Sequence, residues 1–265
     1  MKFYIMTDME GVSGIVDQSY CQLDGCFYEK GKRLTTLEVN AAIEGILNTG
    51  NHDIIVCDGH GPGGLDIELL NKEARLIMGR PLDFLFQMDT EPYDGFLMVG
   101  QHAMKNTPAA NLDHTFNSKS ILSLTISSIP MGEAGVNALR AGIFHIPTIY
   151  LSGDTAACAE IKALVLTICT CSVKQAITPT SAICLQPEKS REKIKNSVIQ
   201  AIENMNRVEP YEILGPVEAI FEFVNASYLQ PYINKDYCTF LSSTQVKIHG
   251  DSIEQLLKCR IWGQE

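Results

Sequence analysis

The sequence lacks a long apolar run and an excess of basic residues, and each absence excludes a class of protein. No stretch of about 18 consecutive apolar residues occurs, so we expect no membrane-spanning helix. The apolar start of the chain reaches acid at Asp8 and is too short for a secretory signal, which favours a cytoplasmic protein. The 21 basic residues face 31 acidic ones, a net charge of −10 that argues against a nucleic-acid partner.

The cysteines also lack the spacing of a disulfide scaffold or a zinc knuckle. There are nine of them, an odd number, and they form no C-x-x-C pair. We therefore expect reduced thiols that pack inside a cytoplasmic protein. The 265 residues, of which 45% are hydrophobic, suffice for one large domain or two modest ones.

Apolar segments typical of buried strands alternate with helical patterns along the first part of the chain. A long loop is expected over residues 11–33, and a T-x-x-E capping box at Thr35 and Glu38 predicts that a helix begins there. Further helices are expected from Glu133, after Asp154 and from Pro187. Strands are expected at residues 3–7, 53–57, 75–78, 95–100, 121–129, 148–151, 219–224 and 244–248.

This alternation predicts an α/β fold with a central, mainly parallel sheet flanked by helices. We assign residues 1–165 to an α/β metal-binding domain. Residues 166–265 are expected to form a smaller α+β C-terminal part, which completes the fold and is a candidate for oligomer contacts.

Metal-binding side chains follow several of the expected strands. Asp8 and Glu10 lie two apart at the end of the first strand, where alternation lets both carboxylates point the same way. His60 follows the second strand, His102 follows the strand at 95–100, and Glu133 begins a helix after a strand. Because ligands bind beyond the carboxyl ends of strands in open α/β sheets, we expect these five residues to converge.

Imidazole and carboxylate together suit zinc, or manganese, cobalt or nickel. Five protein ligands exceed the three of a typical mononuclear catalytic zinc and fit two divalent ions that share a carboxylate and a water. Each residue has an ordinary alternative: a loop carboxylate, a hydrogen-bonded turn histidine, or a first-turn glutamate favoured by the helix dipole. The hypothesis of a metal site depends on the five residues together.

Two other features bear on function. His114 lies beside Asp113 in a polar loop, where it is a candidate general acid or base or, alternatively, a surface histidine.

Gly59, Gly61 and Gly64 match the dinucleotide pattern G-x-G-x-x-G, but they follow the second strand, and the next strand does not end in the expected acid. A flexible turn beside His60 explains these glycines better.

Several phrases resemble a known family, the zinc-dependent D-aminopeptidases associated with dipeptide-transport genes. The phrases are TDMEGVSG, CDGH, GQHA, DHTF and GEAGVNALRAG, and the similarity thins after about residue 185. The resemblance implies two zinc ions bound by Asp8, Glu10, His60, His102 and Glu133, with His114 as the catalytic nucleophile or base. It also implies release of N-terminal D-amino acids such as D-alanine from short peptides, by a homo-oligomer that forms a decameric ring.

We therefore expect a binuclear metallo-aminopeptidase that acts on short peptides, with acidic groups such as Asp58 holding the substrate ammonium or orienting a ligand histidine. One alternative keeps the metals and changes the substrate, as in an L-aminopeptidase or another amide hydrolase. A different class, a nonenzymatic protein that binds small metabolites through the 59–64 turn, is the second alternative.

Overall fold

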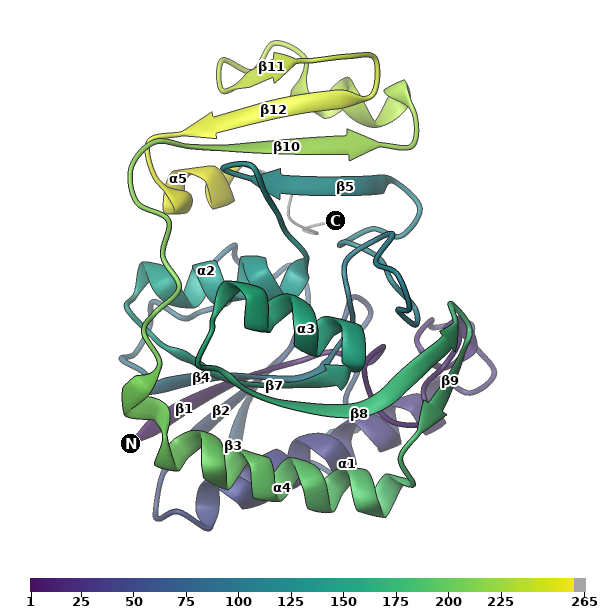
Figure 1. Cartoon of the computed structure of the whole chain (residues 1–265), viewed down its shortest axis with the longest axis vertical. Coiled ribbons are helices and arrows are strands. Elements are labelled where there is room, and N and C mark those ends of the chain that lie inside the picture. Colours follow the sequence, from purple (N-terminus) through teal and green to yellow (C-terminus); the bar gives the residue numbers. More distant parts are fainter. Residues whose placement is uncertain (260–265) are drawn as a thin grey trace.

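The computed structural model describes residues 1–259 and contains two β-sheets with helices between and outside them (Figure 1). The larger sheet has the strand order β3-β2-β1-β4-β7-β8-β9. Its strands pair in parallel, except that β8 and β9 are antiparallel. Their bounds are β1 (Lys2–Thr7), β2 (Asp53–Asp58), β3 (Ala74–Ile77), β4 (Gly95–Gln101), β7 (Thr148–Asp154), β8 (Cys169–Thr178) and β9 (Ser181–Cys184).

Helices cover both faces of the larger sheet, so the predicted α/β class is confirmed. Strands β4 and β7 are buried along their whole length, as expected for parallel strands packed on two sides. One face is covered by α1 (Tyr28–Leu47) and α4 (Pro187–Glu203), the other by α2 (Glu133–Ile143) and α3 (Thr155–Leu164) (Figure 1).

The smaller sheet is antiparallel, with the order β11-β12-β10-β5-β6, and lies beyond α2 (Figure 1). On the side of α2 that faces the smaller sheet, Val136 and Leu139 are buried in a second hydrophobic core. On the other side, Ala138 packs into the core of the larger sheet. Because α2 is shared by the two cores, its position is fixed from both sides. The remaining elements are β5 (Ile121–Ile126), β6 (Ile129–Pro130), β10 (Val217–Phe223), β11 (Cys238–Phe240), β12 (Gln245–Gly250), α5 (Ile253–Lys258) and the 3-10 turns Gln18–Tyr20, Met205–Arg207 and Ala226–Tyr232.

The expected start of the first helix was wrong. Helix α1 begins at Tyr28, so Thr35 and Glu38 lie inside it rather than at its cap. The Thr35 hydroxyl donates to the Gly31 carbonyl one turn earlier (3.0 Å), and the Glu38 carboxylate accepts hydrogen bonds from other segments. The expected strand at 121–129 is also shorter, because Ser127 and Ser128 form a turn with positive φ between β5 and β6.

Each sheet takes strands from both sides of residue 165. Strands β8 and β9 complete the larger sheet, and β5 and β6 join the smaller one. The division into residues 1–165 and 166–265 therefore stays a prediction.

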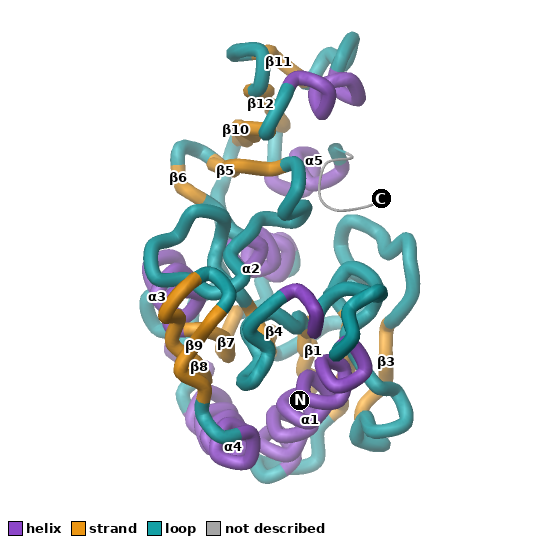
Figure 2. The backbone as a smooth tube through the Cα atoms, turned by 90° about the vertical axis from the view of Figure 1, so that its right-hand side faces the viewer, coloured by secondary structure: helices purple, strands orange, loops and turns teal. Residues whose placement is uncertain are grey.

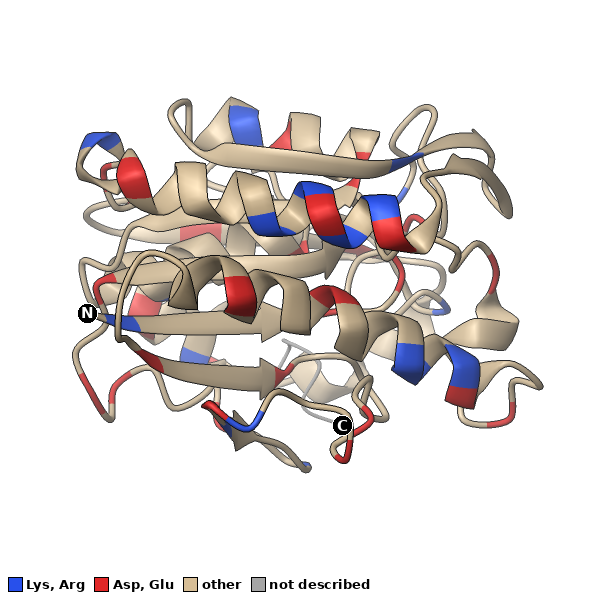
Figure 3. Ribbon diagram, turned by 90° about the horizontal axis from the view of Figure 1, so that it is seen from below, with Lys and Arg blue, Asp and Glu red and all other residues tan. Residues whose placement is uncertain are grey.

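The outer face formed by α1 and α4 presents charges of both signs. In the view from below (Figure 3), Lys and Arg alternate with Asp and Glu along the helices nearest the reader. Some of these charges form ion pairs, among them Lys189–Glu192 (2.6 Å) and Lys195–Glu44 (3.0 Å). Within residues 1–259, no helix combines the length and apolar character needed to cross a bilayer.

Candidate metal centre

The five predicted ligands meet at the carboxyl edge of the larger sheet, the side that faces the reader in Figure 2. Asp8 and Glu10 follow β1, which lies between β2 and β4 in the sheet. His60 follows β2 and His102 follows β4, so three adjacent strands deliver side chains to one place. Glu133 reaches the same place from the first turn of α2.

A close backbone contact sets Asp8 beside the end of β4. The Asp8 amide donates to the Val99 carbonyl (2.9 Å), and the Gly11 amide donates to the Gly100 carbonyl (2.7 Å). Gly100 has a φ of 82°, and a Cβ there would collide with the Asp8 carbonyl oxygen. This contact therefore requires glycine at position 100.

The ligand atoms form two groups that Asp8 joins. In the first group, His60 Nδ1 lies 3.1 Å from Asp8 Oδ1 and 3.2 Å from Glu10 Oε2. In the second, His102 Nε2 lies 3.3 Å from Glu133 Oε1 and 3.4 Å from Asp8 Oδ2. The two oxygens of one carboxylate thus face two different histidines, which is the arrangement of a bridging ligand.

Hydrogen bonds fix which nitrogen of each histidine faces the carboxylates. His60 Nε2 donates to the Cys21 carbonyl (2.8 Å), and His102 Nδ1 donates to the Ala103 carbonyl (2.8 Å). A carbonyl oxygen only accepts, so these nitrogens hold the hydrogen of the neutral ring. The opposite nitrogens then direct lone pairs at carboxylate oxygens, which is favourable only with a proton or a metal ion between them.

Burial strengthens this requirement. Among the described residues, Glu10 Oε2 and His102 Nε2 are buried without a hydrogen-bond partner. Burial by itself lowers the pKa of His60 and of His102, but the neighbouring carboxylates raise both well above the ordinary value. The site thus stabilises positive charge at the nitrogens that face the carboxylates, and its residues fit a divalent cation.

The carboxylates respond to the same surroundings. Burial, with the charge of Glu10, raises the pKa of Asp8 to about 7. Burial also raises the pKa of Glu133, but His102 outweighs it and brings the value to about 2. Glu133 Oε1 additionally accepts the Phe116 amide (2.7 Å), which holds the loop that follows His114 against α2.

His114 lies at the edge of the second group. Its ring stacks on His102 with centroids 3.8 Å apart, and its Nε2 lies 3.8 Å from Glu133 Oε1. Its Nδ1 donates to the Leu112 carbonyl (2.9 Å), so the Nε2 lone pair is free to act toward the site. Burial lowers the pKa of His114, which favours the neutral form.

The turn after β2 is closed by Asp58, which corresponds to one of the two roles considered for this residue in the sequence. Asp58 accepts the Gly64 amide on both oxygens (2.8 and 2.9 Å), so it closes the turn that holds His60. Residues 61–73, all described, contain no helix, and β3 begins at Ala74. The glycine pattern therefore does not place a helix N-terminus where a pyrophosphate would need it.

Sequence reasoning missed a buried lysine that joins two parts of the site. Lys174 Nζ donates to the carbonyls of Glu10 and Ile15 (2.5 Å to Ile15) and to Asn111 Oδ1 (2.7 Å). It thereby ties the loop of Glu10 to the loop that leads to His114. No local signal marks it, because Lys174 becomes buried only when β8 joins the sheet.

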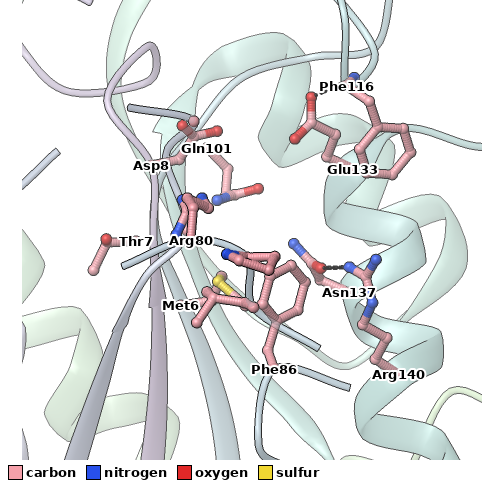
Figure 4. A pocket seen from close by; sticks show the side chains of 14 residues that line it. Met6, Thr7, Asp8, Arg80, Phe86, Gln101, Phe116, Glu133, Asn137 and Arg140 are labelled. Atoms are coloured by element: carbon pink, nitrogen blue, oxygen red, sulfur yellow. Dashed lines mark hydrogen bonds between the residues drawn. The ribbon is translucent and has the colours of Figure 1, made fainter. Parts of the chain in front are cut away.

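Two cavities meet at the ligands. The first, here called the α2 cavity, has a volume of about 440 Å³ and lies between the strand ends and α2 (Figure 4). The second, the loop cavity, has a volume of about 430 Å³ and lies under the loops at residues 18–24 and 114–119. Asp8 and Glu133 line both, so a molecule that spans the two cavities passes over the candidate metal ligands.

The comparisons with known proteins agree with this geometry. A family model described as D-aminopeptidase matches residues 1–260. A D-aminopeptidase of Bacillus subtilis (strain 168) is 30% identical over 257 residues, which cover 96% of this chain and 90% of that protein. The solved structure of the Zn-dependent D-aminopeptidase DppA from Bacillus subtilis, a self-compartmentalizing protease, matches with a TM-score of 0.91 at 28% identity, covering 97% of this chain and 94% of that one.

Proposed function

The chain belongs to the D-aminopeptidase family, and we propose that it is a two-zinc aminopeptidase that releases N-terminal D-amino acids, such as D-alanine, from short peptides. The observation that supports this most is a pair of neighbouring ligand groups. Asp8, Glu10 and His60 offer atoms within 4.8 Å of one another, and so do His102, His114 and Glu133. Asp8 joins the two groups, because its Oδ2 lies 3.4 Å from His102 Nε2. Zinc is the metal of the structural relative, and imidazole with carboxylate suits it.

The five ligands divide between two ions in a simple way. Asp8 Oδ1, Glu10 and His60 would hold one ion, and Asp8 Oδ2, His102 and Glu133 would hold the other. Two divalent ions bring four positive charges against three carboxylates, which leaves a small positive excess. Zinc held by these residues would supply a Lewis acid that lowers the pKa of water and polarises the scissile carbonyl.

His114 has the geometry of a group that acts on the substrate rather than on the metal. Asp8 Oδ2 would supply a third protein ligand beside His102 and Glu133, so a second ion would be held without His114, although His114 belongs to the same cluster of candidate ligands. Its Nδ1 is anchored, and its Nε2 faces the site. We assign to Nε2 the role of general base, which takes a proton from the attacking water, or of nucleophile.

A panel of dipeptides tests the proposed substrate class. Zinc-loaded protein is incubated with the four stereoisomers of Ala-Ala and with their N-acetylated forms, and released alanine is measured. We expect D-residues with a free amino group to be favoured, and N-acetylation to abolish release. Faster release from L-Ala peptides would indicate an L-aminopeptidase, release from acetylated peptides another amide hydrolase, and no release a binding protein.

We further propose that the chain forms a homo-oligomer, and that this oligomer is a decameric ring. The support is the description of the structural relative as self-compartmentalizing. A ring that encloses the active sites would restrict substrates to short peptides. Light scattering that gives the mass of a single 29.2 kDa chain at micromolar concentration would contradict this proposal.

A further inference from the structure

The α2 cavity contains a guanidinium that no carboxylate neutralises by direct contact. Arg140 is 1% exposed and lines this cavity. Its Nε donates to the Phe84 carbonyl (2.9 Å), its Nη1 donates to Asn137 Oδ1, and its Cζ lies 4.5 Å from the ring centre of Phe86. Within residues 1–259, no hydrogen bond of Nη2 is formed and no salt bridge involves Arg140.

A buried charge of this kind is costly unless an anion compensates it. Burial lowers the pKa of Arg140, to about 10, so the group remains charged at neutral pH. Among the described residues that line the α2 cavity, the only carboxylates are those of Asp8 and Glu133, which we assign to the metals. Glu133 acts on this charge only from a distance, so an anionic ligand that enters the cavity meets a guanidinium without a directly paired carboxylate.

A second buried polar group faces the same space. Gln101 is 2% exposed, and its Oε1 has no hydrogen-bond partner among the described residues. Figure 4 shows its amide extending between the strand ends and α2, across from Asn137. The Gln101 oxygen is therefore an acceptor that a ligand N–H group can satisfy.

The spacing along α2 relates these groups to the metals. Glu133, Asn137 and Arg140 occupy positions i, i+4 and i+7, which share one face of a helix. Seven residues span about 10 Å along the axis, and the hydrogen bond from Arg140 Nη1 to Asn137 Oδ1 draws the guanidinium toward the Glu133 end of the helix. Successive Cα atoms are about 3.8 Å apart, so a separation of up to about 10 Å between Glu133 and the guanidinium leaves room for one or two residues beyond the scissile bond.

We propose that the α2 cavity binds the C-terminal, leaving part of the substrate, and that Arg140 pairs with its free α-carboxylate while Gln101 accepts one of its N–H groups. Arg80 also lines the cavity, but its guanidinium already donates to three backbone carbonyls. Apolar side chains of Met6, Leu82 and Phe86 line it too and suit small side chains such as the methyl of alanine. The substrate class is thus a short peptide with an unmodified carboxyl end. This inference rests on the proposed function.

The opposite cavity suits the other end of the peptide. Asp8, Glu10 and Glu133 line the loop cavity but are assigned to the metals, so Asp24 is the carboxylate that remains among its described lining residues, and Lys119 lines the same cavity. A dipeptide with its carboxyl end at Arg140 would lie across the metals with its ammonium toward Asp24.

The test compares two substrates that differ only at the carboxyl end, D-Ala-D-Ala and D-Ala-D-alaninamide, with the zinc-loaded wild-type protein. We expect kcat/KM to be about 10- to 100-fold higher for the free acid, the size of a charge-assisted hydrogen bond. Equal values would overturn the inference and leave the proposed function intact, because both substrates would still be cleaved. Failure to cleave both substrates would overturn the inference and the proposed function together.

Variants then assign the selectivity to Arg140. Arg140→Gln should reduce the acid-to-amide ratio of kcat/KM toward one, and Arg140→Lys should restore part of it. The control is Arg75→Gln, which removes an exposed arginine paired with Glu91 (2.8 Å) and should leave the ratio unchanged. An Arg140→Gln protein that folds and keeps the wild-type ratio would overturn the inference. If that variant does not fold, the wild-type comparison and Arg140→Lys decide.

Discussion

Replacing His114 by asparagine separates a catalytic histidine from a metal ligand. The His114→Asn side chain can still donate to the Leu112 carbonyl, as Nδ1 does at 2.9 Å, but it has no atom in place of Nε2. The substitution also removes the ring stacked on His102 at 3.8 Å. An aromatic pair contributes about 1 kcal/mol, so we expect a small loss of stability and a folded protein.

The assay measures zinc content, kcat and KM on one preparation of each variant. His114→Asn should retain both zinc ions, while kcat falls by about 10²–10⁴-fold, as for loss of a general acid–base group. His60→Asn should lose zinc and activity together, because it removes an imidazole from the first group. His145→Asn, at a side chain 81% exposed and paired with Glu212, is the control and should change neither quantity.

Two results would refute this reasoning. Loss of zinc from His114→Asn would place His114 among the ligands, and the mechanism would need another base. Full zinc content with nearly full activity would mean that His114 has no part in the chemistry.

Two further predictions concern buried groups that support the site. Burial raises the pKa of Glu38 from 4.5 to about 7, so the folded state binds its proton more tightly; the resulting cost is absent below pH 4.5 and complete above pH 7. Glu38→Gln should therefore stabilise the protein at pH 8 by about 3 kcal/mol and leave its stability unchanged at pH 4. The control Glu44→Gln, at an exposed carboxylate, should have little effect at either pH. Urea unfolding in which the effect of Glu38→Gln is the same at both pH values would contradict this prediction. Lys174→Met should cost on the order of 3 kcal/mol of stability and lower kcat, since three acceptors lose their donor. Lys193→Met, which removes one exposed hydrogen bond, is its control in the same unfolding and kinetic measurements, and equal effects of the two would refute the role of Lys174.

The convergence of the candidate metal ligands could be predicted from sequence because their signals are local. Asp8, His60 and His102 each follow a continuous apolar run, and such a run indicates a buried strand without knowledge of its neighbours. Parallel strands all end at the same edge of their sheet, so residues that follow them lie near one another. The structure brings these residues together as expected.

The start of α1 could not be predicted in the same way. Thr35 and Glu38 match a capping box in sequence, but the hydroxyl of Thr35 bonds within the helix and Glu38 bonds to Ser13 and Ser190. Ser190 is 152 residues away, so the sequence pattern does not reveal this contact. Tertiary contacts outweighed a local motif.

The groups proposed to bind substrate were also missed, for a related reason. Arg140 and Gln101 are ordinary polar residues in sequence, on a helix and at a strand end. Only the packing of α2 between two cores buries Arg140 and leaves Gln101 Oε1 without a partner. Burial of a polar group is a property of the assembled fold, and single-sequence patterns do not encode it.

The central claim is that two metal ions join the five ligands and support peptide cleavage. The most direct test is elemental analysis of the purified protein together with D-Ala-D-Ala hydrolysis, before and after chelation and with zinc returned. We predict about two zinc ions per chain in the wild type, loss of at least one in Asp8→Ala, and activity that follows zinc content. Metal-free protein with full activity would contradict the account.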